Sequence, residues 1–241
     1  MHRFFVPPSW IRGERVTIEG PQAHQIRHVL RMHAGDHVLV LDNSGWEIET
    51  ELQLVESQEV MGRVVSRRLS TGEPRTKVSL YQSVLKSKGF EAVLQKGTEL
   101  GIVEFVPLIS ERCIVSDLES LEKKRIRWEA IIQEAAEQSR RGRKPVLRPS
   151  TLFPQACDHA RQTGGLSLIL WEEKGPVALR TLLRTAPPGR EKRWPPSFTS
   201  GGSTSRPLAR ASSKITCTLS VSFMTAERLA AQKAAGWWAF R

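Results

Sequence analysis

A short segment near the amino terminus gathers basic side chains at helical spacing. From Pro21 to Met32, basic residues recur every three or four positions with apolar residues between them. We therefore predict a helix with Pro21 in its first turn and a cationic face opposite an apolar one. The cationic residues are His24, Arg27, His28 and Arg31, and the apolar residues are Ala23, Ile26, Val29 and Leu30. Such a face suits contact with nucleic-acid phosphates, although a solvated helix face fits about equally well.

Two further clusters carry groups that could do electrostatic or acid–base work. Lys86-Ser87-Lys88 ends a predicted strand, which is where ligands commonly meet α/β sheets, and a plain surface pair of lysines is the alternative. The polar side of a long predicted helix carries Glu134, Glu137, Gln138, Arg140 and Arg141. Acidic and basic groups at this spacing commonly form compensating surface ion pairs, which is the competing interpretation.

Several familiar sites are not encoded. His24 and His28 have the spacing of a metal pair, but no third ligand is marked, so no metal is predicted. The sequence has no GxGxxG after a strand, no Walker loop and no GxSxG elbow. A dinucleotide cofactor, NTP hydrolysis by a P-loop and an α/β-hydrolase nucleophile are therefore not expected.

The first 72 residues contain the strand-like runs 4–6, 15–18, 37–41, 47–54 and 61–65, which Pro, Gly and Asn turns separate. Short strands punctuated in this way predict a small β-barrel, 1–72, and residues 70–74 then read as a linker. From residue 77 the pattern becomes alternating strands and helices. We expect a two-domain α+β protein whose second domain, 77–241, is an α/β layer with a mostly parallel sheet.

The second domain has clear boundaries for its elements. Strands are predicted at 78–85, 102–109 and 166–171, and a helix at 87–100 that Gly101 closes. A longer helix begins at Ser116, has a capping box with Glu119 and is predicted to end at Gly142. Its apolar stripe is Leu121, Trp128, Ile131, Ile132 and Ala135.

The charge balance points to a polyanionic partner. There are 36 Lys and Arg against 25 Asp and Glu, which gives a net charge of +11 and a pI near 10.1. Three widely spaced cysteines suit a reducing compartment, and no apolar run is long enough to span a membrane. The amino terminus lacks the features of a secretory signal, so we expect a cytoplasmic protein that binds nucleic acid.

Four blocks carry a family resemblance. Residues 95–115, QKGTELGIVEFVPLISERCIV, are accompanied in order by RFFV at 3–6, HQIRHVLRMHAGD at 24–36 and WEAIIQEAAEQSRR at 128–141. Over about 1–185 the chain resembles the RsmE family, which belongs to the SPOUT superfamily of knotted methyltransferases. That family uses S-adenosylmethionine to methylate N3 of a uridine in 16S ribosomal RNA. Its members are homodimers whose subunits both contribute to the active site.

The resemblance implies a PUA-like barrel that binds RNA, followed by a SPOUT (trefoil-knot) domain. Uridine N3 must lose a proton, and negative charge then spreads to the flanking carbonyls, which basic groups would stabilise. The catalytic candidates are Arg140, Glu137 and Lys86, with Arg3 and Arg141 as further basic groups. Expected RNA contacts are Arg3, His24, Arg27, His28 and Arg31. Expected cofactor contacts are Leu170, Glu172 and Glu173 in the strand segment that resembles the edge of the cofactor site.

The carboxyl-terminal part departs from this family. A GPEGGF-like loop and an LG-x-RILR-x-ETA segment normally build the knot and surround the cofactor, and neither is present. Residues 190–222 stand where the first belongs; they are rich in Ser and Thr and have no acidic residue from Lys192 onward, so we expect them to be disordered. We expect a truncated end and an incomplete knot, and a local reading-frame change would explain the replacement. The chain is then expected to bind RNA and methylate it poorly. The alternatives are a catalytically inactive RNA-binding relative and an RNA chaperone in ribosome assembly.

Overall fold

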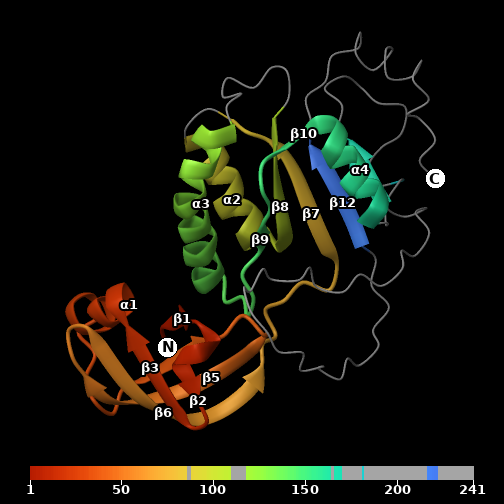
Figure 1. Ribbon diagram of the computed structural model, residues 1–241. Coiled ribbons are helices and arrows are strands. Elements are labelled where there is room, and N and C mark those ends of the chain that lie inside the picture. Colours follow the sequence, from red (N-terminus) through yellow and green to blue (C-terminus); the bar gives the residue numbers. More distant parts are fainter. Residues whose placement is uncertain (86–87, 110–117, 164–165, 170–180, 182–215, 222–241) are drawn as a thin grey trace, which may run out of the picture. The chain divides into compact units, whose positions relative to one another are not determined.

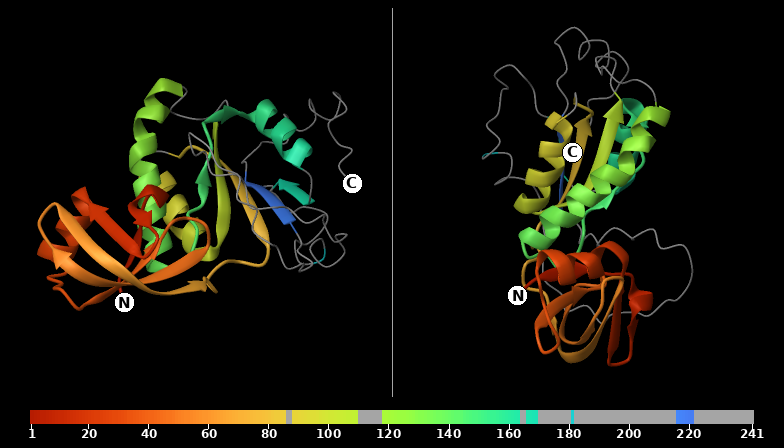
Figure 2. Two further views of the ribbon diagram at one scale, coloured as in Figure 1. Left: turned by 60° about the horizontal axis from the view of Figure 1, so that its bottom comes forward. Right: turned by 90° about the vertical axis from the view of Figure 1, so that its left-hand side faces the viewer.

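The computed structural model describes residues 1–85, 88–109, 118–163, 166–169, 181 and 216–221. The chain forms two compact units, and each has its own β-sheet (Figures 1 and 2). The first unit comprises Met1–Glu73 and Ala130–Lys144, and the second comprises Pro74–Glu129 and Pro145–Arg241. Residues 130–144 contain most of the block WEAIIQEAAEQSRR (128–141). They therefore belong to the amino-terminal unit rather than to the unit of the residues that precede them.

The first unit contains a six-stranded sheet with the order β1-β4-β5-β6-β3-β2. Its strands are β1 (Arg3–Phe5), β2 (Ile11–Arg12), β3 (Arg15–Glu19), β4 (His37–Leu41), β5 (Trp46–Val55) and β6 (Glu59–Leu69). β1 pairs with β4 in parallel and the other neighbours are antiparallel. The predicted strands are confirmed, whereas β2 and the 3-10 turn η1 (Pro8–Trp10) carry no pattern that the sequence revealed.

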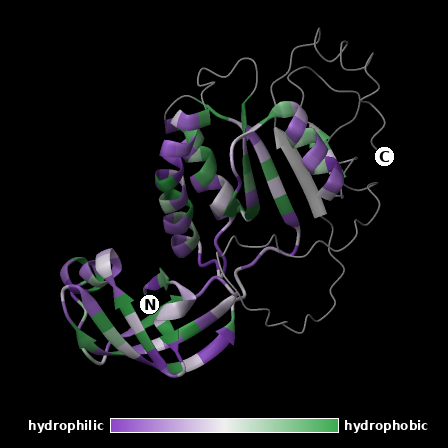
Figure 3. Ribbon diagram, viewed as in Figure 1, coloured by the Kyte–Doolittle hydropathy of each residue, from purple (hydrophilic) through white to green (hydrophobic). Residues whose placement is uncertain are grey.

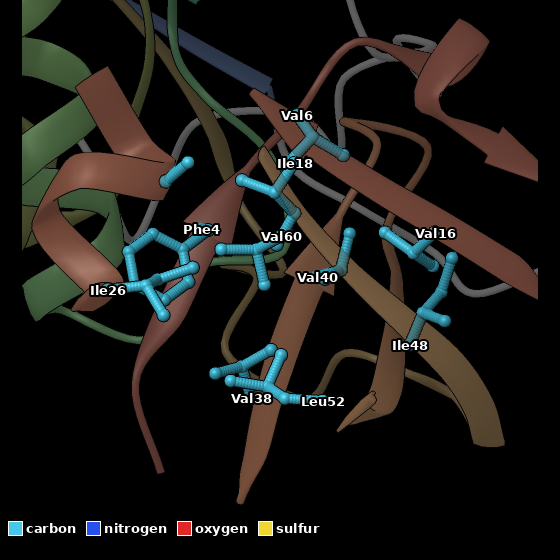
Figure 4. Close-up of a cluster of buried hydrophobic side chains, with 11 residues drawn as sticks. Phe4, Val6, Val16, Ile18, Ile26, Val38, Val40, Ile48, Leu52 and Val60 are labelled. Carbon is cyan, nitrogen blue, oxygen red and sulfur yellow. The ribbon is translucent and has the colours of Figure 1, made fainter. Parts of the chain in front are cut away.

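The curled sheet surrounds an apolar core (Figure 4). Alternate residues of each strand point inward, as the two-residue period of a strand requires. The labelled members are Phe4, Val6, Val16, Ile18, Ile26, Val38, Val40, Ile48, Leu52 and Val60. Ile26 comes from the helical segment, so that segment is anchored to the same core.

The helix predicted at 21–32 is confirmed up to Val29, where it is a π-helical turn, but its predicted end at Met32 is wrong. α1 (Gly20–His24) continues into the π-helical turn η2 (Gln25–Val29), where the Leu30 N–H donates to the Gln25 carbonyl at 2.9 Å. Ala23 and Ile26 are buried as expected, but Val29 is 65% exposed, so its assignment to the apolar face is wrong. The wider π turn rotates later residues away from a 3.6-residue period, which carries Val29 out of the buried stripe.

The second unit contains a parallel sheet with the order β10-β8-β7-β12-β11, and β9 also pairs with β8. Its strands are β7 (Lys77–Ser83), β8 (Ile102–Ile109), β9 (Val146–Leu147), β10 (Thr151–Leu152), β11 (Leu166–Ile169) and β12 (Thr216–Val221). The predicted parallel arrangement is confirmed. Figure 3 shows β8 largely in hydrophobic colours, as expected for a strand covered on both faces, whereas β7 is mixed.

Helices cover both faces of this sheet. α2 (Lys88–Leu100) packs on the Phe105 face of β8, where a Cβ at Gly97 would lie 2.7 Å from the Phe105 ring. α4 (Phe153–Thr163) packs through Ala156 and Ala160 on the opposite face, with Val106. Gly101 ends α2 with φ +98°, as predicted, because this left-handed conformation is strained for other residues.

The long helix α3 (Leu118–Gln138) confirms most of its predicted stripe. Leu121, Trp128, Ile132 and Ala135 are buried, and Ile131 is half-buried. The predicted end at Gly142 is wrong. The helix ends at Gln138 because Arg140 adopts φ +57°, while the N–H groups of Arg140 and Arg141 donate to the carbonyls of Glu137 and Ala136. This is the Schellman pattern, with arginine where glycine is usual.

One expectation about residues 190–222 is also wrong. Thr216–Val221 forms β12, which lies between β7 and β11 and pairs in parallel with both. Cys217, Leu219 and Val221 alternate with Thr or Ser in this stretch, which is a β-strand pattern that the abundance of Ser and Thr obscured. Residues 190–215 lie outside the described residues. Within the described part of the chain, none of the helices is long and apolar enough to cross a membrane.

Candidate functional site

The parallel sheet brings several strand ends to one edge. β8, β7, β12 and β11 are consecutive neighbours and run in the same direction, so their carboxyl ends meet there. Ligands of open α/β sheets bind at such an edge. In sequence, Lys86 follows β7, and Leu170, Glu172 and Glu173 follow β11. These four predicted site residues lie outside the described residues.

In the first unit, Arg3 belongs to a buried ion-pair network. Its Nη2 donates to Glu47 Oε1 at 2.6 Å, and Arg68 Nε donates to the other Glu47 oxygen at 2.9 Å. Burial alone would raise the pKa of Glu47, but the hydrogen bonds from Arg3 and Arg68 outweigh it and hold the pKa below its ordinary value. Arg3 Nη2 also lies 3.4 Å from the Arg141 carbonyl oxygen. The Arg3 guanidinium therefore forms its hydrogen bonds largely within this unit.

Glu137 joins the helix end to the first strand. Its Oε1 accepts the Phe5 N–H at 3.1 Å and the Gln133 side-chain amide at 3.2 Å. Gln133 Oε1 in turn accepts from Lys144 Nζ at 3.1 Å. Burial raises the pKa of Glu137, partly opposed by the Phe5 hydrogen bond. Glu137 thus positions the EQSRR segment (137–141) against β1. These contacts differ from the compensating surface ion pairs along the helix that were the competing interpretation.

This raised pKa makes a pH-dependent prediction. The folded state favours protonated Glu137, so its contribution to stability is present below pH 4.5, the ordinary value, and is lost as pH rises through the folded-state pKa. A glutamine at this position would mimic the protonated form at every pH. We expect the unfolding free energy of Glu137→Gln, relative to the parent, to increase from below pH 4.5 to neutrality, as measured by urea titrations. The exposed Glu134→Gln is the control. A relative stability of Glu137→Gln that stays constant or falls contradicts the prediction.

Glu73 closes the segment that follows α3. Its Oε2 accepts from Arg141 Nη2 at 3.1 Å, and its Oε1 accepts the N–H groups of Gly142 and Arg143, both at 3.0 Å. Arg141 is only 2% exposed, so it is a structural group in this unit rather than one that a ligand could reach. No sequence spacing indicates this contact, because the partners are 68 to 70 residues apart.

Two glycines allow the segments 70–73 and 139–143 to interlock. A Cβ at Gly72 would overlap the Arg140 carbonyl oxygen, and a Cβ at Gly142 would overlap the Ser70 side chain. The Arg140 backbone is therefore held in its left-handed conformation from outside the helix. Its side chain is exposed and has no hydrogen bond or ion pair with any described residue. Strained residues of this kind concentrate at functional sites.

The cationic residues predicted from the sequence are solvent-exposed, but Arg31 lies two residues beyond the end of the helical segment and so is not on its face. His24, Arg27, His28 and Arg31 are all exposed, and the His24 and His28 rings lie 4.6 Å apart between centroids. Arg27 Nη1 donates to the Val55 carbonyl, and His28 Nε2 lies 3.2 Å from Ser57 Oγ. Among the described residues, no group of three His, Cys, Asp or Glu is placed to hold a metal.

Comparison with known proteins shows which proteins this chain is similar to. Residues 72–189 match the family described as an RNA methyltransferase domain. The ribosomal RNA small subunit methyltransferase E of Bacillus subtilis is 34% identical over 159 residues, 64% of this chain and 62% of that protein. Over these segments the chain is similar to methyltransferases of the RsmE family. A Synechocystis relative with the same name is 32% identical over 169 residues, 70% of this chain and 54% of that protein. The matched segments thus span less than two thirds of both relatives.

Solved structures support the fold of this chain. The RsmE protein of Neisseria gonorrhoeae, solved with S-adenosyl methionine bound, superposes with a TM-score of 0.73 at 22% identity, covering 98% of this chain and 86% of that one. A Legionella pneumophila methyltransferase, solved with the same cofactor, gives 0.69 at 22% identity, covering 98% and 96%. At this identity the likeness establishes the fold alone, with a mixed curled sheet and a parallel sheet.

Proposed function

We propose that this chain is an S-adenosylmethionine-dependent methyltransferase that acts on N3 of a uridine in 16S ribosomal RNA. The observation that carries the proposal is the family match over 72–189, together with relatives named as ribosomal RNA small subunit methyltransferases. We assign the target of these relatives to this chain because of its sequence similarity to them. The net charge of +11 agrees with an RNA substrate.

The proposed chemistry assigns roles to the chain's own residues. The cofactor supplies an electrophilic methyl group, and Leu170, Glu172 and Glu173, which follow a parallel strand, would hold it. Arg140 has an exposed guanidinium on a fixed backbone, which suits stabilisation of the negative charge that develops on the uridine carbonyls. Lys86 would contribute from the end of β7, and Glu137 positions the segment that bears Arg140.

The proposal extends to the whole assembly. Residues 1–72 would act as a PUA-like barrel that binds RNA, and 77–241 as the SPOUT domain with an incomplete knot. Arg3 would support the RNA-binding face through its network with Glu47, whereas His24, Arg27, His28 and Arg31 would touch RNA directly. A homodimer in the cytoplasm, with the small ribosomal subunit as partner, fits this family role.

The cationic face makes a testable contribution to RNA binding. We expect Arg27→Ala with Arg31→Ala to weaken RNA binding and to reduce the slope of log K against log salt by about two, one for each lost phosphate contact. Fluorescence anisotropy at several salt concentrations measures the slope. Lys123→Ala with Lys124→Ala removes the same charge from exposed positions of α3 and serves as the control. Equal slopes for the parent and the Arg27/Arg31 variant exclude this face from the RNA interface.

A second candidate function is RNA binding without methyl transfer. It is favoured by one observation: the family match ends at residue 189, and 190–222 contain no GPEGGF-like stretch. In the family this loop surrounds the cofactor. A chain with a different sequence there would retain RNA binding by the first unit and lose its affinity for S-adenosylmethionine.

One pair of measurements separates the two candidates. RNA from small subunits that lack the modification is incubated with the chain and S-adenosylmethionine, and N3-methyluridine is quantified by mass spectrometry. Isothermal titration with S-adenosylmethionine is run on the same preparation. Product formation that Arg140→Ala abolishes supports the enzyme, whereas RNA binding without cofactor binding supports the second candidate. Methylation at another position of the RNA would overturn the proposed specificity.

A further inference from the structure

A pocket of about 560 Å³ opens on the first unit beside the π-helical turn. This volume falls within the range of small-ligand sites in proteins. The pocket lies between the end of the helical segment and the end of β5. Its lining residues are Arg27, His28, Arg31, Met32, His33, Ala34, Gln53, Leu54 and Val55.

The lining combines a basic rim with an apolar wall. Arg27, Arg31 and the two histidines supply the rim, and none of the lining residues carries a carboxylate. Met32, Leu54 and Val55 supply the wall, and Leu54 remains 40% exposed there. The bond from Arg27 Nη1 to the Val55 carbonyl holds this guanidinium against the wall. A ligand with an anionic part and a flat apolar part would match both surfaces.

Backbone strain lies at the same place. Arg31 adopts φ +54°, a left-handed conformation that is uncommon for a long side chain. It follows the π turn directly, and the Met32 N–H donates back to the Ile26 carbonyl at 3.0 Å. π turns and left-handed residues are both concentrated at functional sites, where the strain fixes the direction of side chains. Here the turn brings Arg31 and His33 to the same pocket as Leu54.

We propose that this pocket holds one unstacked nucleotide of single-stranded RNA, an inference that rests on the proposed function. The base lies on Leu54 and Met32 beneath the Arg31 guanidinium or the His28 ring, because arginine and histidine planes both stack on bases. The Gln53 amide can donate to and accept from a base edge, and Arg27 meets the phosphate. A base within an RNA duplex stays stacked in the helix, so a duplex could meet only the basic rim.

The test compares RNA with and without bases, using the whole chain. Fluorescence anisotropy measures the binding of a labelled short oligouridylate, of a ribose-phosphate oligomer of equal length without bases, and of a duplex. We expect Leu54→Ala to weaken binding of the oligouridylate by about tenfold, as loss of one stacked base would, with its salt slope unchanged. Binding of the oligomer without bases and of the duplex should not change.

Leu69→Ala is the matched control, because Leu69 is an exposed leucine of the same sheet that does not line the pocket. Equal affinity of the parent for oligomers with and without bases would overturn the proposal, as would an oligouridylate affinity that Leu54→Ala leaves intact. N3-methyluridine formation is measured separately on the same preparations. A chain that binds bases but transfers no methyl group would contradict the proposed enzyme and leave the pocket supported, and the reverse result would reject the pocket alone.

Discussion

Replacing Trp128 by alanine is expected to lower the free energy of unfolding by about 3–5 kcal/mol. The side chain is 4% exposed, and its ring lies against Phe90 of α2, with centroids 4.6 Å apart and planes tilted by 54°. Alanine would leave a large cavity between α2 and α3 and remove this aromatic pair. Urea titrations followed by far-UV circular dichroism measure the loss.

Two variants sharpen this test. Ile126→Ala lies on the same helix at a position that is 80% exposed, so its effect should stay within about 0.5 kcal/mol. Trp128→Phe keeps an aromatic ring, so it should lower the free energy of unfolding clearly less than Trp128→Ala does. A loss below about 1 kcal/mol for Trp128→Ala would mean that the site collapses around the missing ring or that the ring is not buried in solution.

Glu73→Ala is the second change with a large expected effect, again a loss of about 3–5 kcal/mol. Without this carboxylate, the buried Arg141 guanidinium loses an ion pair, and the N–H groups of Gly142 and Arg143 lose a shared carboxylate acceptor. Removal of one partner from a buried pair costs far more than the pair contributes net, because the remaining ion has left water without compensation. The same urea titrations measure this effect.

Glu99→Ala provides the comparison, because Glu99 pairs with Lys96 on an exposed face of α2. Its loss should change stability by no more than about 1 kcal/mol. Glu73→Gln keeps one carbonyl acceptor, so its loss of unfolding free energy should lie between those of Glu73→Ala and Glu99→Ala. Similar small losses for Glu73→Ala and Glu99→Ala would show that water reaches Arg141 in solution.

Local patterns determined most of the elements. The alternation in β4 and β5, the apolar stripe of α3 and the Gly101 end of α2 could all be found without a structure. Each depends on neighbours a few residues away, and burial on one face enforces the period. The short blocks that contain TELG (98–101) and EQSRR (137–141) carried the family resemblance, because each is a run of neighbouring residues.

Local patterns failed where a second segment decides the conformation. α3 stops at Gln138 and not at Gly142 because the 70–73 segment holds Arg140 in a glycine-like conformation. Val29 leaves the apolar face because a π turn replaces the regular helix. Thr216–Val221 becomes a central strand because β7 and β11 supply partners on both sides, which composition cannot reveal.

By itself, the sequence determined the longer strands and helices of both units, the basic character of the chain and the identity of the residues able to do chemistry. Only the tertiary structure decided which of those residues remain available. Arg3 forms an ion pair with Glu47, and Arg141 forms one with Glu73. Arg140, the neighbour of Arg141 in the sequence, is exposed. These pairings join residues that are 44 and 68 positions apart, and bringing them together costs loop entropy that only the packing of whole sheets and helices offsets.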